Sequence, residues 1–125
     1  MEHQLHVSLD KSTTPWSVDI DQRGDANHVE RSLEPQLLAW ELTGDAASGN
    51  LLALQWLDPA PPEGIFGPPE LVKNGQRMTM TDRNHGPDSS GSWVYRLSLA
   101  LDGQQYSTRS ILLTGTTTNP SIKNN

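Results

Sequence analysis

The clearest structural signal in the chain is the sequence Gly91-Ser92-Trp93-Val94-Tyr95-Arg96-Leu97-Ser98-Leu99-Ala100-Leu101-Asp102-Gly103. Every odd-numbered residue from Trp93 to Leu101 is aromatic or Leu, and the residues between them are Val, Arg, Ser and Ala. An apolar residue at every second position predicts a β-strand with one face in a core. Asp102-Gly103 favours the positive φ angles of a tight hairpin turn, so a partner strand is expected at 105–114.

Other parts of the chain repeat this pattern in short runs separated by turn residues. Five more strands are predicted, at 5–9, 16–20, 38–42, 51–57 and 77–81. The run 51–57 is apolar on both faces except at Gln55, which predicts a central strand, and a change of apolar side near Arg109 predicts a β-bulge. The seven runs together predict an all-β fold, a two-sheet β-sandwich of about seven strands.

The 125 residues are enough for one domain. We expect it to cover 1–114, followed by a polar C-terminal tail at 115–125 in which Ile122 is able to dock. Residues 22–36 allow a short helix. Residues 58–70 contain five Pro, which cannot donate to a sheet ladder, so a long loop is expected there.

The order of these runs has features of an immunoglobulin-like domain. Trp56 lies on the predicted central strand, and the segment Asp88-Ser89-Ser90-Gly91-Ser92-Trp93-Val94-Tyr95 resembles the corner that enters the sixth strand of such domains. An aromatic ring closes that corner, and Trp93 stands where Tyr is usual. Because the chain has no Cys, the inter-sheet disulfide is absent and a vertebrate-type domain is not indicated.

A second resemblance uses other residues. The segment Leu33-Glu34-Pro35-Gln36-Leu37-Leu38-Ala39-Trp40, with Gly91-Ser92-Trp93-Val94-Tyr95 downstream, is similar to the core strands of cupredoxin-like sandwiches. A blue-copper centre needs a thiolate, so the lack of Cys implies a copper-free cupredoxin-like domain, and no cofactor is expected. Each resemblance covers about residues 33–114 and implies architecture alone.

Composition limits the classes of partner. The formal net charge of −6, without a Lys/Arg cluster, disfavours nucleic acid. No apolar stretch is long enough to span a membrane, and the first residues lack the pattern of a signal peptide, so we expect a cytoplasmic protein. The absence of Cys also excludes disulfides and thiol catalysis.

Two acidic segments are candidates for calcium binding, because carboxylate and amide oxygens are ligands for this ion. Residues 19–30 partly match an EF-hand loop, although Arg23 stands where an oxygen ligand belongs. A second loop lies between predicted strands. The candidate ligands are Asp19, Asp21, Asp25 and Glu30 in the first segment and Asp82, Asn84 and Asp88 in the second. Asp and Asn also cap turns without any ligand, and this interpretation is favoured for both segments.

Signatures of catalysis are absent from the sequence. The four His, at 3, 6, 28 and 85, have no zinc-binding spacing, and there is no nucleophile elbow. We therefore expect no enzymatic activity.

The four Trp offer a platform for stacking sugar rings, but each shares a strand face with aliphatic residues. That alternation favours a place in the core for Trp16, Trp40, Trp56 and Trp93.

Ile65 and Phe66 are apolar residues in the Pro-rich loop, where no strand would bury them. They are the candidate contacts for a protein partner, with the alternative that the loop tucks Phe66 under the sandwich edge. The leading hypothesis is a non-enzymatic protein-protein interaction module of bacterial type, whose partner is another protein or a second copy of itself (a homo-oligomer). The alternative is a ligand-binding module for a glycan or calcium.

Overall fold

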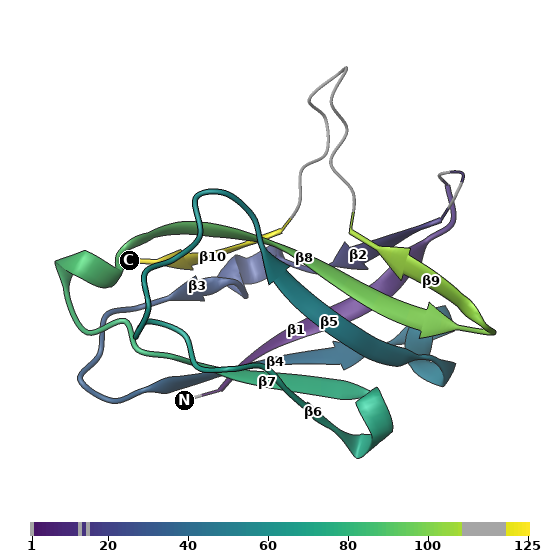
Figure 1. Cartoon of the computed structure of the whole chain (residues 1–125), viewed down its shortest axis with the longest axis horizontal. Coiled ribbons are helices and arrows are strands. Elements are labelled where there is room, and N and C mark those ends of the chain that lie inside the picture. Colours follow the sequence, from purple (N-terminus) through teal and green to yellow (C-terminus); the bar gives the residue numbers. More distant parts are fainter. Residues whose placement is uncertain (1, 13, 15, 109–119) are drawn as a thin grey trace.

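The computed structural model describes residues 2–12, 14, 16–108 and 120–125, and these form two β-sheets that pack face to face (Figure 1). The first sheet contains, in spatial order, β2 (Ser17–Ile20), β1 (Glu2–Asp10), β4 (Gln36–Leu42), β7 (Arg77–Asp82) and β6 (Glu70–Val72). The second contains β3 (His28–Val29), β10 (Ser121–Asn124), β8 (Gly91–Leu101) and β5 (Asn50–Trp56), with β9 (Gln104–Ser107) also paired to β8. The predicted all-β two-sheet sandwich is confirmed.

Strand β8 organises the second sheet. One of its edges pairs with β5 over residues 95–100, and its other edge pairs first with β10 and then with β9. Asp102 and Gly103 both have positive φ angles, 52° and 78°, which is the turn expected between β8 and β9. Both sheets are mixed, because β1 runs parallel to β4 and β3 runs parallel to β10.

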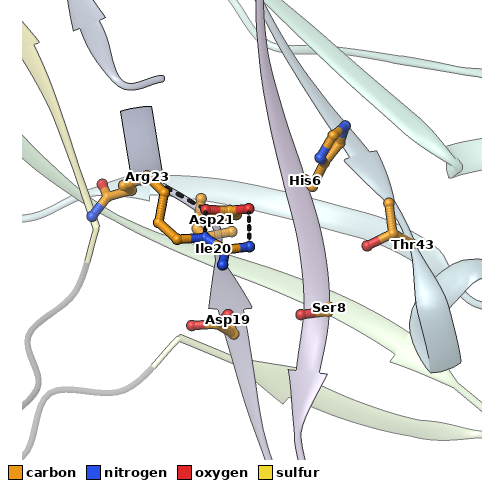
Figure 2. Close-up of a pocket in the computed structure, with 8 residues that line it drawn as sticks. His6, Ser8, Asp19, Ile20, Asp21, Arg23 and Thr43 are labelled. Carbon is orange, nitrogen blue, oxygen red and sulfur yellow. Dashed lines mark hydrogen bonds and ion pairs between the residues drawn. The ribbon is translucent and has the colours of Figure 1, made fainter. Parts of the chain in front are cut away.

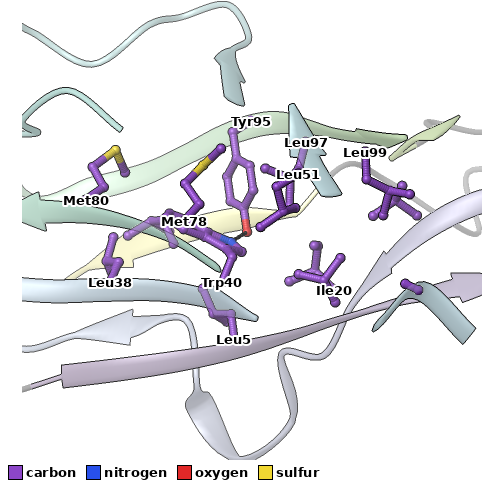
Figure 3. Packing of buried hydrophobic residues seen from close by; sticks show 14 of the residues in the cluster. Leu5, Ile20, Leu38, Trp40, Leu51, Met78, Met80, Tyr95, Leu97 and Leu99 are labelled. Atoms are coloured by element: carbon purple, nitrogen blue, oxygen red, sulfur yellow. Dashed lines mark hydrogen bonds between the residues drawn. The ribbon is translucent and has the colours of Figure 1, made fainter. Parts of the chain in front are cut away.

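The core lies between the two sheets and is centred on Trp40 and Tyr95 (Figure 3). Both side chains are fully buried, with ring centroids 5.6 Å apart in an edge-to-face arrangement. Trp40 Nε1 donates a hydrogen bond of 2.9 Å to the Tyr95 hydroxyl. Burial raises the pKa of Tyr95, so this hydroxyl stays neutral. Trp40 belongs to β4 and Tyr95 to β8, so the pair joins the two sheets.

The prediction of a central strand at 51–57 is wrong, because β5 is an edge strand of its sheet. Its register with β8 shifts between Leu51 and Ala53. Leu51 is buried before this bulge, and Leu54 and Trp56 pack against the core after it. The bulge changes which alternate residues face inward, so both faces of the run look apolar in the sequence.

Two further segments differ from what the sequence allowed or predicted. Residues 22–36 contain no α-helix: Arg23–Asp25 is a single 3₁₀ turn, η1, and strand β3 follows it. The expected polar tail 115–125 contains β10, which lies between β3 and β8 and buries Ile122 completely. The last residues are therefore part of the sandwich. The predicted bulge near Arg109 lies outside the described residues.

Trp93 does close the corner before β8. Its Nε1 donates to the carbonyl oxygen of Ser89, four residues upstream, at 3.3 Å. Ser89 ends a short 3₁₀ turn, η4 (Pro87–Ser89), that leads into the strand.

Within the described part of the chain, no helix is long and apolar enough to cross a membrane.

Replacing Tyr95 with Phe should destabilise the protein by about 1–3 kcal/mol, because Trp40 Nε1 would lose its acceptor while remaining buried. The free energy of unfolding from urea titrations measures the effect. Tyr106→Phe is the matched control, since its hydroxyl bonds to Gln104 at the surface and its loss should cost less than about 0.5 kcal/mol. Equal losses in the two variants would contradict the assigned role of the Trp40–Tyr95 bond.

Candidate functional site

The open edge of the first sheet is formed by β6, the last strand in its order. Glu70, Leu71 and Val72 are all exposed, with Leu71 at 48% and Val72 at 37%. Each pairs with β7 on one side only. A sheet edge of this kind presents backbone N–H and C=O groups that can pair with another chain. These three residues are called the β6 edge below.

The other sheet edges are less suited to pairing with another chain. Strand β3 has two residues, and β5 carries the bulge that twists an edge away from pairing. The beginning of β5 also packs against η3 (Lys73–Gly75), the 3₁₀ turn that follows β6. Strand β2 lies against β9 of the opposite sheet. The β6 edge therefore combines open pairing groups with exposed apolar side chains.

The partner contacts predicted in the Pro-rich loop lie against the fold. Ile65 is buried at 6% exposure, and its carbonyl oxygen accepts a 2.7 Å hydrogen bond from the Arg83 N–H. Phe66 is half-buried, with its ring centroid 4.6 Å from that of Trp56. The loop thus folds back onto the end of β7, as in the alternative interpretation. That Ile65 and Phe66 contact a protein partner stays a prediction, and their low exposure does not support it.

The first acidic segment borders an open polar cleft of about 510 Å³ (Figure 2). Asp21 is held there by Arg23, whose Nε and Nη2 donate to the two carboxylate oxygens at 3.0 and 2.9 Å. Arg23 lowers the pKa of Asp21 to about 2, mainly through these side-chain hydrogen bonds. Arg23, which breaks the EF-hand pattern, therefore already binds the Asp21 carboxylate that a calcium ion would need.

The other members of that segment point to different partners. Asp25 Oδ1 lies 3.6 Å from His28 Nε2, and Glu30 accepts a hydrogen bond from Asn125 at the other end of the chain. Asp19 is exposed on β2. Among the described residues, no three His, Asp or Glu side chains gather in a way that would hold a metal ion.

The second acidic segment is divided between core and surface. Asp88 is exposed in η4, whereas Asp82 and Asn84 are fully buried. Asn84 Nδ2 donates to the carbonyl oxygens of Val29 and Asn125, and its Oδ1 accepts from Ser89 Oγ at 2.7 Å. The Asn84 amide thus ties its own loop to two distant segments, through long-range bonds rather than through the local turn caps favoured from the sequence.

Trp16 corrects the expectation that all four Trp lie in the core, since it is 38% exposed just before β2. Its ring stacks on Tyr106 of β9 with centroids 5.9 Å apart and planes at 21°. Lys11 Nζ lies 4.7 Å from the centroid of the Trp16 ring and 2.9 Å from an oxygen of Asp45. Trp40 is in the core as expected, and Trp56 and Trp93 are half-buried.

Two of these features were missed in the sequence, although each leaves a trace there. The dipeptide Leu71-Val72, one residue after Pro68-Pro69, is a short apolar run in a Pro-rich context, which fits an edge strand. The exposed Trp16 and Tyr106 are both visible in the sequence, but their stacking could not be predicted, because it depends on how the two sheets pack. Neither a scan against protein-family models nor a search of curated proteins finds a match for this chain.

Replacing Phe66 with Ala should lower the melting temperature by several degrees, because the contact with Trp56 would be lost. Thermal unfolding followed by circular dichroism measures the change. Leu33→Ala is a suitable control, since Leu33 is 91% exposed and its loss should leave the melting temperature nearly unchanged. A Phe66 variant as stable as the parent would restore this residue as a candidate partner contact.

Proposed function

We propose that the protein is a non-enzymatic interaction module that binds a second copy of itself through the β6 edge. The observation that carries the proposal is an exposed edge strand with two exposed apolar side chains, Leu71 and Val72. Pairing of two such edges would extend the sheet across a twofold axis and bury those side chains.

The charges beside the edge fit a second copy. In an antiparallel pair with Leu71 opposite Val72 of the other copy, Glu70 at the start of β6 comes near Lys73, which begins η3 directly after β6 of that copy, and the twofold axis repeats this approach. Opposite charges across the pair favour this register. Because β6 has only three residues and follows two prolines, the pairing is short, which gives a weak dimer rather than an extended assembly.

The resemblance to known sandwiches is also part of the proposal. Of the two families, the copper-free cupredoxin-like one is favoured here, because immunoglobulin-like sheets are antiparallel and this chain pairs β1 with β4 and β3 with β10 in parallel. Neither resemblance supplies a chemical activity.

A glycan-binding role is the second candidate, and the exposed stack of Trp16 and Tyr106 supports it. Thr14 and Gln104 line the same surface and provide hydrogen-bonding groups of the kind that bind sugar hydroxyls. Tyr106 and Lys11 already use part of the Trp16 π-surface, so a sugar ring would have to compete with them. Leu71 and Val72 of the β6 edge are exposed, and among the described residues no ring stacks on them, so this edge is the preferred site.

Sedimentation velocity over a range of protein concentrations tests the proposed dimer. We expect the parent chain to dimerise as its concentration rises, and Leu71→Lys to remain monomeric, because a charge on the edge blocks pairing. Leu33→Lys makes the same chemical change at an exposed Leu away from every strand and should still dimerise. A parent chain that stays monomeric at the highest concentration, or equal loss in both variants, would refute dimerisation through β6.

Calorimetric titration with neutral oligosaccharides tests the second candidate. If the Trp16 surface binds sugar, Trp16→Ala should abolish the heat of binding, since aromatic stacking supplies most of the contact, while Trp16→Phe should retain part of it. Trp93→Phe serves as a control at a half-buried Trp on another strand. Binding that survives in Trp16→Ala would place the sugar site elsewhere.

A further inference from the structure

A buried polar pair closes one end of the core, between the end of β7 and β10. Asp82 is fully buried and Asn124 is 4% exposed. Asn124 Nδ2 donates to Asp82 Oδ1 at 3.1 Å and to the Ser89 carbonyl oxygen at 3.0 Å. Since β7 belongs to the first sheet and β10 to the second, this pair is a polar link between the sheets.

The link is incomplete as it stands. Among the described residues, the buried side-chain N and O atoms without a hydrogen-bond partner are Asp82 Oδ2 and Asn124 Oδ1. Both belong to the same bonded pair, and both are acceptors when Asp82 is ionised. Two buried acceptors without donors are costly, so an ionised Asp82 leaves both of these oxygens unsatisfied.

The orientation of the Asn124 amide is fixed by its neighbours. If its oxygen and nitrogen were exchanged, the oxygen would face the Ser89 carbonyl and Asp82 Oδ1, which are both acceptors. The amide nitrogen must therefore point to these two atoms. Asn124 Oδ1 is left needing a donor, and an ionised Asp82 has none to give.

We propose that Asp82 is a proton-binding latch: in the folded protein at mildly acidic pH its Oδ2 carries a proton and donates it to Asn124 Oδ1. The acid and the amide then exchange two hydrogen bonds, and both buried oxygens are satisfied. When Asp82 loses this proton, β10 keeps one of the two bonds and faces a buried carboxylate. The attachment of β10 to the first sheet thus weakens as pH rises.

The electrostatic surroundings agree with this assignment. Burial raises the pKa of Asp82 from 3.8 to about 6, and the opposing effects of the Asn124 hydrogen bond and the charge of His85 are smaller. Other charged or titratable groups lie on the segments packed against Asp82: Arg83 and Asp88 in the same loop, and Lys123 on β10. On the neighbouring strand β4, Gln36 lies opposite Asp82 and is hydrogen-bonded to the His3 ring and to the Glu30 backbone carbonyl oxygen. Arg83, Asp88, Lys123 and Glu30 are exposed, and His3 is half-buried.

The sign of the pH effect follows from this shift. Between pH 3.8 and about 6 the folded state holds a proton that the unfolded chain releases. The free energy of unfolding therefore falls as pH rises through this window and becomes constant above it. This direction is opposite to that of a carboxylate stabilised by an ion pair, such as Asp21.

The test is the melting temperature of the parent chain, Asp82→Asn and Asp88→Asn from pH 4 to 8. An Asn at position 82 keeps the shape of the acid and carries a permanent N–H donor. We expect Asp82→Asn to gain on the parent as pH rises, reaching an advantage of about 5 °C near pH 7. Asp88→Asn, in the same loop but exposed, should follow the parent at every pH.

Carbon-13 NMR of the Asp carboxyl groups in the parent chain gives a second readout that does not depend on a variant folding. The Asp82 signal should titrate near pH 6, well above the signals of exposed Asp residues. A midpoint near 4 would overturn the proposal. So would an Asp82→Asn variant whose melting temperature stays at a constant offset from the parent across the whole pH range.

Discussion

The contact between Trp40 and Tyr95 is the constraint on which the rest of the sandwich depends. Each residue is the largest fully buried side chain of its sheet, and a single 2.9 Å hydrogen bond satisfies the indole donor. Because both polar atoms must meet inside the core, the two sheets have little freedom to slide. The register of β4 with β7 and of β8 with β5 then places Met78 beside Trp40 and Trp56 beside Tyr95. The aromatic series continues from Trp56 to Phe66, which brings the Pro-rich loop down onto the fold.

The fold class was predictable because period-two alternation depends only on neighbouring residues in one strand. From Trp93 to Leu101 the predicted inward residues other than the half-buried Trp93 are all buried, and the Asp102-Gly103 turn has the expected backbone. Strands β3 and β6 escaped prediction because two or three residues are too short to show a period, and β10 escaped because Ile122 is its one apolar residue. The sequence pattern also could not reveal the bulge in β5, since an inserted residue imitates a strand that is apolar on both faces.

The candidate sites were less predictable, because they depend on contacts between distant segments. Phe66 looked stranded in its loop, and its burial against Trp56 follows from sheet stacking rather than from local sequence. The acidic residues of 19–30 looked alike, yet Arg23 bonds to Asp21 while Asp25 and Glu30 turn to other neighbours. Asp82 had the same appearance as Asp88 in the sequence. Only the packing of the two sheets, which brings Asn124 of β10 to Asp82 from 42 residues away, makes one of them a core residue.

The β6 edge and the Asp82–Asn124 pair differ in the kind of polar group that each presents. At the β6 edge the polar groups belong to the backbone, which water satisfies until another strand replaces it, so binding there costs little desolvation of side chains. At Asp82 the polar groups are side chains already removed from water, and a proton is the smallest species that completes their hydrogen bonds. Both features arise from where a strand lies or how it ends. Among the described strands, β6 is the last in its sheet, and in β7 the inward alternation of Met78 and Met80 continues to Asp82. An apolar residue at position 82 would fill the same space, but Asn124 of β10 would lose the bond from its Nδ2 to Asp82 and keep only the one to the Ser89 carbonyl oxygen.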